Sequence, residues 1–367
     1  MRRLPVQQEA SNTLNFHELA TDIKRWGREL GFQQVGITDT DLGEHPEYLA
    51  QWLENGYQAN MEWLREPKRV DPEALIPGTQ RIISLRMDYL PAEPRIHEIL
   101  SDGNRAYLAR YALGRDYHKI IRKRLQQLAD RIAATVGPFG YRAFVDSAPV
   151  LEKALASKAG LGGMGKHTVI LNRSAGSYFF LGELFTDLPL PVDEPVSSHC
   201  GSCQACIDIC PTQAIVAPYT LDAGKCISYL TIEYRGVIPL ELRRAIGNRI
   251  FGCDDCQLVC PWNRYAQASQ ESAFTPRHAF DGPPLLDLWA WDEPTWLKQT
   301  EGMPLRRMNY ASWLRNLSTA LGNAPQSPEI LAALQARKQS LAEHGQLDAV
   351  LAEHLDWAIA EQALTPR

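Results

Sequence analysis

The first half of the chain alternates between two hydrophobic periods. Apolar residues recur at helical spacing from Leu19 to Leu30, and Gly31 would end that helix. Polar and apolar residues then alternate over 32–38, as in a half-buried strand. Similar patterns predict further helices over 47–64 and 117–136, and further strands over 81–85, 142–145, 167–171 and 178–184. Because helices and strands interleave, we predict an α/β (α+β) domain in which helices cover a sheet.

The remainder of the chain divides into three regions. Residues 196–265 hold all the cysteines, and residues 266–304 form a connector that is rich in proline and tryptophan. Helical spacing returns in 310–322 and 328–363, with turn signals between, which predicts short helices packed side by side. The predicted domains are therefore 1–195, 196–265, 266–304 and 305–367.

The composition is that of an ordinary globular protein. The chain has 367 residues, 45% of them hydrophobic, and a formal net charge of -5. This mildly acidic balance excludes a general attraction to nucleic acid or membrane, so a polyanionic partner would have to meet a local basic patch. The sequence contains no apolar run long enough to span a bilayer.

All eight cysteines fall into one pattern. The first group has the spacing C-x2-C-x2-C-x3-C-P, and the second repeats its last three positions with the leading cysteine moved upstream. This is the signature of a bacterial ferredoxin with two iron-sulfur clusters, in which the fourth cysteine of a run binds the other cluster. The predicted 4Fe-4S ligands are Cys200, Cys203, Cys206 and Cys260 for one cluster, and Cys226, Cys253, Cys256 and Cys210 for the other.

Two other uses of these cysteines fit the sequence less well. Structural zinc sites use paired C-x2-C motifs but need neither a third cysteine at the same spacing nor a following proline. Disulfides need an oxidising compartment, and the twin arginine at Arg2 and Arg3 is followed by a mixed stretch without an apolar region. We therefore predict reduced thiols and a cytoplasmic protein.

The glycine-rich segment 160–165 matches G-x-G-x-x-G, but its context is wrong for a dinucleotide site. A helical pattern precedes it and a strand pattern follows it, the reverse of the nucleotide-binding order. A P-loop is also excluded, because His167 stands where Ser or Thr must bind magnesium. The segment is either a tight turn, which is the favoured interpretation, or a place where backbone approaches a large flat ligand.

Asp146 ends the predicted strand 142–145 and has two interpretations. Ligand sites in α/β folds form at the carboxyl ends of strands. Asp146 or Ser147 could instead cap a helix that begins near Pro149, and spacing alone favours the cap. The nearby segment 116–118 begins like the cobalamin motif D-x-H-x-x-G, but Ile121 replaces the glycine, so His118 is not assigned to cobalt.

Taken together, these features resemble the epoxyqueuosine reductases, a family of cobalamin-dependent iron-sulfur enzymes of tRNA modification. The matching stretches are 111–118, 144–149, 156–166 and 313–323, together with the cysteine pattern. The resemblance implies that the α/β domain holds cobalamin base-off and that electrons pass through both clusters to cobalt. It also implies that Asp146 donates a proton while epoxyqueuosine at the tRNA wobble position is reduced to queuosine, with the C-terminal helices forming a HEAT-like module that contacts the tRNA.

The resemblance further implies site residues and partners. For Asp146 to be protonated near neutral pH, we expect burial beside the corrin and Phe144 to raise its pKa. An external donor of flavodoxin or ferredoxin type would supply electrons to a monomer without membrane contact. The implied cobalamin contacts are Arg69, Tyr117, His118, Asp146, Lys158, Gly160, Gly162, Gly165 and Lys166. The implied tRNA contacts are Arg243, Arg244, Arg306, Arg307, Trp313 and Arg315, with the aromatic ring stacking on unpaired bases.

Two rival functions are compatible with the same motifs. A cytoplasmic enzyme resembling the reductive dehalogenases would share the clusters and base-off cobalamin. A non-catalytic electron-transfer protein would use the clusters to feed an external partner and would not retain cobalamin. The basic residues in the C-terminal part also have a simpler interpretation, because solvated helix faces commonly carry such charges.

Overall fold

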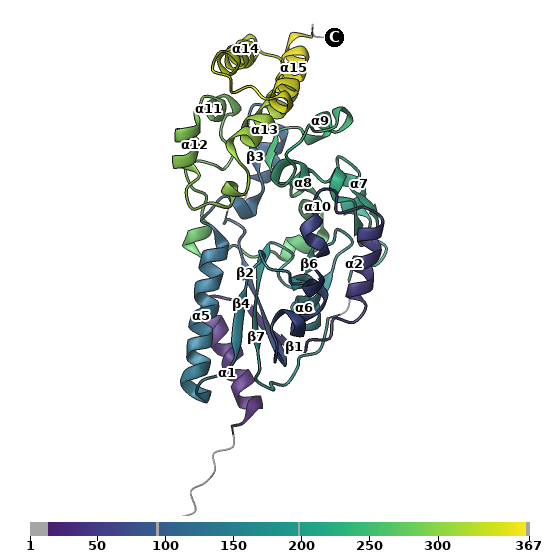
Figure 1. The fold of residues 1–367 in the computed structure, drawn as a ribbon, viewed down its shortest axis with the longest axis vertical. Coiled ribbons are helices and arrows are strands. Elements are labelled where there is room, and N and C mark those ends of the chain that lie inside the picture. Colours follow the sequence, from purple (N-terminus) through teal and green to yellow (C-terminus); the bar gives the residue numbers. More distant parts are fainter. Residues whose placement is uncertain (1–13, 93–94, 197–198, 365–367) are drawn as a thin grey trace, which may run out of the picture.

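The computed structural model describes residues 14–92, 95–196 and 199–364. The first 13 residues, on which most of the signal-sequence argument rests, lie outside this part of the chain. Figure 1 shows a sheet with its helices at one end of an elongated molecule, and helices from the C-terminal part at the other. None of the helices within the described ranges has the length and hydrophobicity that crossing a membrane requires.

A four-stranded sheet organises the first end of the molecule. Its strands are β1 (Gln34–Thr38), β2 (Arg81–Asp88), β7 (Phe179–Thr186) and β4 (Tyr141–Phe144), in that spatial order. Every neighbouring pair is antiparallel. The argument that placed a ligand site at Asp146 by analogy with parallel sheets is therefore wrong, since in an antiparallel sheet the strand ends alternate between edges.

Helices cover both faces of this sheet, as the alternating pattern predicts. On one face, α1 (Phe16–Glu29) packs beside α5 (Tyr117–Val136), whose Ile121 and Leu125 lie close to Gly182 of β7. On the other face lies α6 (Glu152–Lys158), which contacts β2 and β7. The bounds of α5 are those that the sequence predicts, because Asp116 caps its start and Gly137 ends it.

Two predicted elements differ from the structure. The helix predicted over 47–64 ends early, as α2 (His45–Glu54), because Gly56 adopts a φ of 71° and starts a turn. The strand predicted over 167–171 is reduced to β6 (Ile170–Leu171), which pairs with β5 (Gly163–Met164). The glycine segment thus begins with a turn at Gly160 and continues as one arm of a small hairpin.

The C-terminal helices build a second core. They are α11 (Leu285–Trp289), α12 (Glu293–Gln299), α13 (Tyr310–Asn323), α14 (Pro328–Glu343) and α15 (Ala349–Ala363). Residues 312–322 of α13 are all buried, so this helix lies at the centre. A segment from the first half of the chain joins this core, since β3 (Tyr107–Leu108) pairs in parallel with β10 (Arg249–Phe251). Part of the predicted domain 1–195 therefore packs with the C-terminal helices.

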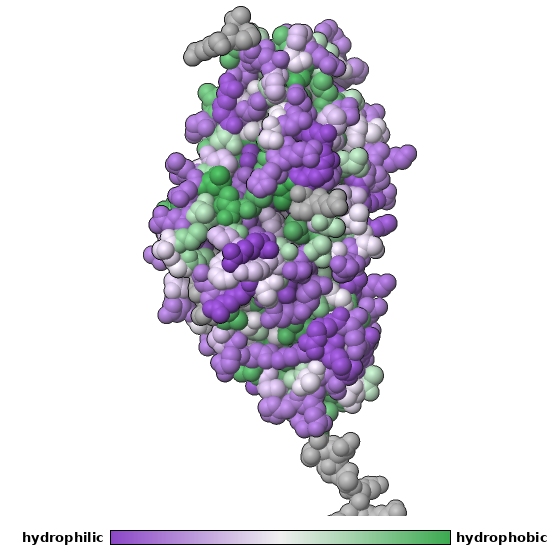
Figure 2. Space-filling view, turned by 180° about the vertical axis from the view of Figure 1, so that it is seen from behind, coloured by the Kyte–Doolittle hydropathy of each residue, from purple (hydrophilic) through white to green (hydrophobic). Residues whose placement is uncertain are grey.

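The cysteine region lies between these two parts (Figure 1). Its elements are α7 (Ala205–Ile209), β8 (Ile215–Ala217), β9 (Thr220–Leu221), α8 (Ile227–Ile232), α9 (Leu240–Ile246) and α10 (Asp255–Leu258). This region also contains the 3-10 turns η4 (Ala223–Lys225) and η5 (Pro261–Tyr265). Short helices elsewhere are α3 (Pro72–Leu75) and α4 (Ile96–Ser101), with 3-10 turns η1 (Glu62–Arg65), η2 (Pro67–Val70), η3 (Arg110–Ala112), η6 (Ser272–Phe274) and η7 (Pro304–Arg307). On the opposite side of the molecule, Figure 2 shows hydrophobic residues gathered at mid-height, level with the junction of the parts, within a mainly hydrophilic surface.

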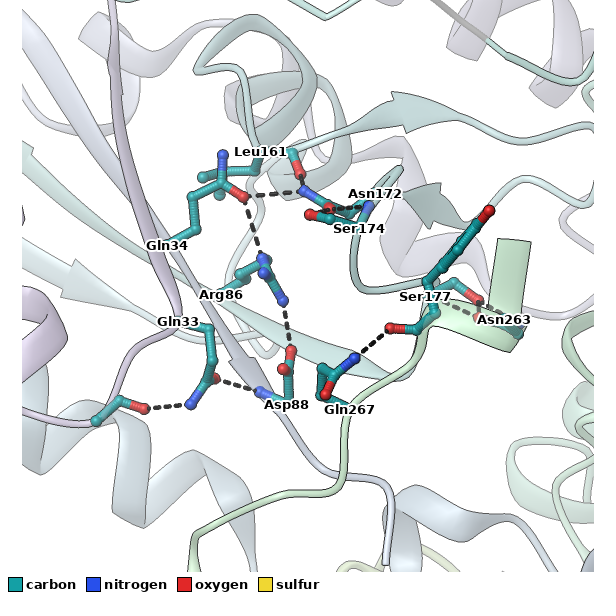
Figure 3. A network of polar contacts seen from close by, with 12 residues as sticks. Gln33, Gln34, Arg86, Asp88, Leu161, Asn172, Ser174, Ser177, Asn263 and Gln267 are labelled. Carbon is teal, nitrogen blue, oxygen red and sulfur yellow. Dashed lines mark hydrogen bonds and ion pairs between the residues drawn. The ribbon is translucent and has the colours of Figure 1, made fainter.

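Polar side chains join the cysteine region to the sheet. Asn263 accepts a hydrogen bond from the Ser177 backbone at 2.7 Å (Figure 3). Gln257 donates to the Ser177 carbonyl at 3.0 Å. Ser177 directly precedes the residues that lead into β7, so these bonds fix the second cysteine motif relative to the sheet. The relative position of the two sites described below depends on this junction.

Candidate active site

Asp146 lies on a tight loop that follows β4. Its backbone has a φ of 54°, in the left-handed region that few residues other than glycine adopt. Its N–H donates to Oε1 of Glu152 at 2.5 Å, and its side chain is 59% exposed. The helix α6 starts at Glu152, and its N-cap Leu151 makes no side-chain cap. The capping interpretation of Asp146 and Ser147 is therefore wrong.

The N-terminus of α5 supplies two partners for the Asp146 carboxylate. The Tyr117 hydroxyl donates to Oδ2, and His118 Nε2 lies 3.3 Å from the same oxygen. On the other side of the His118 ring, Nδ1 lies 2.7 Å from Oδ1 of Asp116. The rings of Tyr117 and His118 stack at 4.1 Å between centroids, and Phe180 stacks on Tyr117 at 4.0 Å. The imidazole is thus fixed between two carboxylates.

The protonation of this group differs from the prediction. Partial burial raises the pKa of Asp146, but hydrogen bonds from His118 and Tyr117 and the charges of His118 and Arg307 lower it by more. Burial lowers the pKa of His118, but its bonds to Asp116 and Asp146 outweigh this and raise it to about 9. The expectation of a raised pKa for Asp146 is therefore wrong in this structure. At neutral pH Asp146 is ionised and the proton resides on His118.

Arg307 brings the C-terminal part of the chain into this site. It belongs to η7, and its charge lowers the pKa of Asp146. Its guanidinium donates two hydrogen bonds to Glu233, at 2.8 Å and 3.1 Å. The pairing holds the guanidinium in one orientation.

The cysteine region brings its thiols together in two groups. Burial raises the pKa of the Cys206 thiol, and its neighbours Cys200, Cys260 and Cys203 raise it further. Burial also raises the pKa of Cys256, with contributions from Cys226 and Cys210 among others. Cys260 of the second motif thus lies with the first group, and Cys210 of the first motif lies with the second.

Backbone and side-chain donors surround these sulfurs. The amides of Lys166 and Ala214 point at Sγ of Cys200 and Cys210, at 3.4 Å and 3.2 Å. Among the residues with described positions, no three His, Cys, Asp or Glu side chains converge on a single ion. Soft thiols in two groups of this kind suit iron-sulfur clusters, in which each cysteine binds a different iron.

Comparison with known proteins identifies the family of this chain. A family model described as epoxyqueuosine reductase QueG, DUF1730, matches residues 69–147, and a 4Fe-4S double cluster binding domain matches residues 199–263. The epoxyqueuosine reductase of Pseudomonas aeruginosa is 60% identical over 350 residues, which cover 95% of each chain. The chain belongs to the epoxyqueuosine reductase family. The Escherichia coli epoxyqueuosine reductase is 55% identical over 96% of this chain and 92% of its own length.

Solved structures of epoxyqueuosine reductases share the fold. One, in complex with a stem loop of an epoxyqueuosine-modified tyrosine tRNA, has a TM-score of 0.83 at 26% identity and covers 95% of this chain and 100% of its own. Another, from Bacillus subtilis, has its catalytic aspartate loop swung out of the active site, with a TM-score of 0.84 at 28% identity. It covers 95% of this chain and 91% of its own.

The cobalamin contacts predicted from this family stay predictions, and the structure shows which groups of the protein each of them bonds. Tyr117, His118 and Asp146 meet, as described above. Lys166 is buried and donates to the carbonyls of Gly201 and Cys203, both at 2.8 Å, so it supports the cysteine loop. Lys158 pairs with Asp39 at 2.7 Å.

Among the predicted cobalamin contacts, Arg69 has a side-chain N–H donor that no described group of the protein accepts. It is only 8% exposed, with its guanidinium over the Trp63 ring. Its NH1 group lies 3.5 Å from the Val150 carbonyl, whereas its buried Nε has no hydrogen-bond partner among the described residues. A buried donor without a partner fits a polar group of a bound cofactor.

The glycines of the family motif are required by the protein itself. A Cβ on Gly162 would lie 2.6 Å from the Leu171 carbonyl oxygen, and one on Gly165 would lie 2.5 Å from the His167 ring. Gly160 has a φ of 77° and faces the Glu194 carbonyl. Asn172 fixes the loop by donating to the Leu161 carbonyl at 2.7 Å and to Gln34 at 2.9 Å (Figure 3).

Three of the predicted tRNA contacts are wrong because they are buried. Trp313 is 0% exposed, so no base can stack on it, and Arg243 and Arg315 are each 1% exposed. Arg315 donates to backbone carbonyls of residues 230, 234 and 236, which ties α13 to the cysteine region. Arg244, Arg306 and Arg307 are exposed, as their prediction requires.

Sequence reasoning overlooked two residues. One is Asp116, the second partner of His118, and the other is Glu183. Asp116 was visible as the first residue of the incomplete cobalamin motif. Glu183 stands at a buried position of an apolar strand and is 0% exposed. A single carboxylate in such a strand was the available signal, because charged residues are almost never fully buried without a partner.

Proposed function

We propose that this chain reduces the epoxide of epoxyqueuosine in tRNA to the alkene of queuosine. The observation that carries this proposal is the Asp146 carboxylate, exposed and hydrogen-bonded by His118 and Tyr117, in a chain that matches named epoxyqueuosine reductases along its length. The tRNA stem loop bound to one structural relative supports the substrate. The reaction consumes two electrons and two protons and releases the epoxide oxygen as water.

The thiols would hold two 4Fe-4S clusters with ligands exchanged between the motifs. Cys200, Cys203, Cys206 and Cys260 form the first ligand set, and Cys210, Cys226, Cys253 and Cys256 form the second. Each cluster passes one electron at a time, and an external donor of flavodoxin or ferredoxin type supplies them. Cobalamin, when bound, supplies the two-electron carrier. The Nε of Arg69 offers a donor that suits a polar group of the cofactor, and the exposed Asp146 carboxylate offers an acceptor.

His118 and Asp146 act as a pair in proton delivery. His118 Nε2 holds a proton against Oδ2 of Asp146, and Asp116 keeps the ring oriented through Nδ1. Asp146 takes this proton when negative charge develops on the epoxide oxygen and passes it to that oxygen. His118 then takes a proton from solvent and delivers it by the same route, so that the hydroxyl formed in the first transfer leaves as water. Another proton from solvent restores the protonated His118. A carboxylate with a lowered pKa can act as an acid in this way because its proton donor lies beside it.

The domains divide the work between them. The sheet part carries the proton donors, the cysteine region carries the electrons, and the C-terminal helices form a HEAT-like module that contacts tRNA. The exposed Arg244, Arg306 and Arg307 belong to the cysteine region and this module, and phosphates of the anticodon arm would bind to such cations. The protein works as a monomer.

The proposal is tested with an anticodon stem loop that carries epoxyqueuosine. Anaerobically reconstituted protein, supplied with cobalamin and dithionite, should convert it to a nucleoside that has lost one oxygen atom, as detected by mass spectrometry. Omission of cobalamin should prevent this conversion. An unchanged stem loop with fully loaded protein would refute the proposed function.

A further inference from the structure

Glu183 is a buried carboxyl at the centre of the sheet. It lies on β7, directly opposite Ser84 of β2 and Phe144 of β4. Its side chain is 0% exposed, and Oε1 accepts a hydrogen bond from the Ser84 hydroxyl at 3.3 Å. Because neighbouring strand residues point to opposite faces, and Gly182 faces α5, the Glu183 side chain points toward α6.

Glu152 at the start of α6 lies between Glu183 and the Asp146 loop. One of its oxygens accepts the Asp146 N–H. Burial and the charge of Asp146 raise the pKa of Glu152 to about 7, although a hydrogen bond with Glu183 opposes the rise. Burial, and then the charge of Glu152, also raises the pKa of Glu183. Oε2 of Glu183 is buried and has no hydrogen-bond partner among the described residues. A proton shared with Glu152 would satisfy this oxygen, because two adjacent buried carboxyls are not both ionised.

The pair therefore connects the rigid centre of the sheet to the residue that faces the substrate. Asp146 needs such support, because its left-handed backbone is unfavourable for a residue with a Cβ. The Ser147 N–H bonds back to the Val145 carbonyl at 2.6 Å, which tightens the loop but does not attach it to a neighbouring element. The bond from Asp146 N–H to Glu152 makes that attachment.

We propose that Glu152 and Glu183 are positioning residues that hold the Asp146 loop in the orientation that presents its carboxylate to His118, Tyr117 and the substrate. Glu152 bonds the loop backbone, and the proton shared with Glu183 fixes the Glu152 carboxyl. This inference rests on the role proposed above for Asp146.

Hydrogen exchange at the Asp146 amide tests the attachment directly. In Glu152→Ala that amide should exchange about tenfold faster or more, because its acceptor is lost and the loop opens. Glu152→Gln keeps an acceptor oxygen of the same reach and should exchange within about twofold of the wild-type rate. Glu329→Ala is the control, since Glu329 is also an acid in the first turn of a helix but lies exposed on α14. Unchanged exchange in Glu152→Ala would overturn the proposal.

A double-mutant cycle then asks whether Glu152 acts through Asp146. Glu152→Ala should lower kcat by about tenfold with an unchanged KM for the stem loop, and it should add little to Asp146→Asn. Equal effects of Glu152→Ala in the wild-type and Asp146→Asn backgrounds would contradict a positioning role. Glu183→Gln should keep the pair hydrogen-bonded and retain activity. Iron content and Tm are measured for Glu183→Gln and for Glu152→Gln, and both should be those of the wild type.

The two proposals fail in different ways. If Asp146→Asn is fully active while exchange at residue 146 still depends on Glu152, the proton-donor role of Asp146 is wrong and the attachment of the loop stands. If Asp146→Asn is inactive while exchange does not respond to Glu152, the positioning inference is wrong and the function stands.

Discussion

The cysteine region takes all its thiols from one continuous stretch, 200–260, whereas the groups around Asp146 come from four separate places in the chain. Asp116 to His118 begin α5, Glu152 begins α6, Glu183 lies on β7, and Arg307 arrives from the far end of the molecule. Electrons are therefore handled by residues whose spacing is local, and protons by residues that only the folded sheet brings together. This contrast explains why electron transfer can be predicted from the spacing of the cysteines, whereas proton transfer depends on tertiary structure.

Substitution of the cluster cysteines should have the largest effect on turnover. Cys203→Ser and Cys256→Ser should each remove one cluster, lower the iron content by about half and abolish turnover, because the loss of either cluster interrupts the same electron path. Iron and sulfide analysis with the stem-loop assay measures both effects. Ser202→Ala, next to Cys203 and likewise exposed, is the control. Full iron content in both serine variants would disprove the ligand assignment.

Substitution of Asp146 should have the next largest effect on turnover. Asp146→Asn keeps the shape of the side chain but cannot carry the acidic proton, so we expect turnover to fall by about 10²-fold or more. The ultraviolet-visible spectra of the clusters and of added cobalamin should be those of the wild type. Turnover near the wild-type rate would remove Asp146 from the mechanism.

His118→Gln should have a smaller effect with a distinctive pH dependence. The pKa of His118 is raised from 6.5 to about 9, so its ion pairs stabilise the folded protein fully below pH 6.5, and this contribution is lost as the pH rises through 9. The Tm difference between wild type and variant should therefore shrink over that interval. Turnover should be about tenfold lower at pH 7, and the alkaline fall of the wild-type rate near pH 9 should disappear. A pH profile unchanged by the substitution would exclude His118 as the proton source.

The smallest effect concerns tRNA binding. Arg306 is exposed and lies over the Trp296 ring, away from the ion pair of Arg307 with Glu233. Arg306→Ala should lower the slope of log affinity against log salt by about one, as for the loss of one phosphate contact. Arg28→Ala makes the same change in net charge on α1, a helix that covers the sheet, and should leave the slope unchanged. Equal slopes for both variants would place the tRNA elsewhere.

The sequence predicts much of this structure where the signals are local. The bounds of α5 follow from a capping aspartate, a helical period and a terminal glycine, and the cysteine spacing identifies the double-cluster domain. The strands of the sheet were also located, but their antiparallel order was not. Strand order depends on pairing between distant segments, which periodicity does not report.

The wrong predictions have a common physical cause. Arg243, Arg315 and Trp313 have residue types that suit RNA binding, but all three are buried. Residues 312–322 of α13 are buried around the whole helix, and Arg315 bonds backbone carbonyls. Arg243, on α9, likewise donates to the Ile238 carbonyl. The pKa of Asp146 was predicted from its own surroundings of Phe144 and corrin. It is determined instead by His118 and Arg307, from two other elements, and one sequence does not show which charges meet.

The pairing of β3 with β10 also affects how this chain is made. At a synthesis rate of about 5–20 residues per second, residue 249 leaves the ribosome roughly 7 to 28 seconds after residue 107. During that interval Leu108, Ala112 and Leu113, which are completely buried in the C-terminal core of the finished protein, have no such core to enter. The nascent sheet part must therefore wait with an exposed apolar segment, and a chaperone that covers this segment would raise the yield of active enzyme.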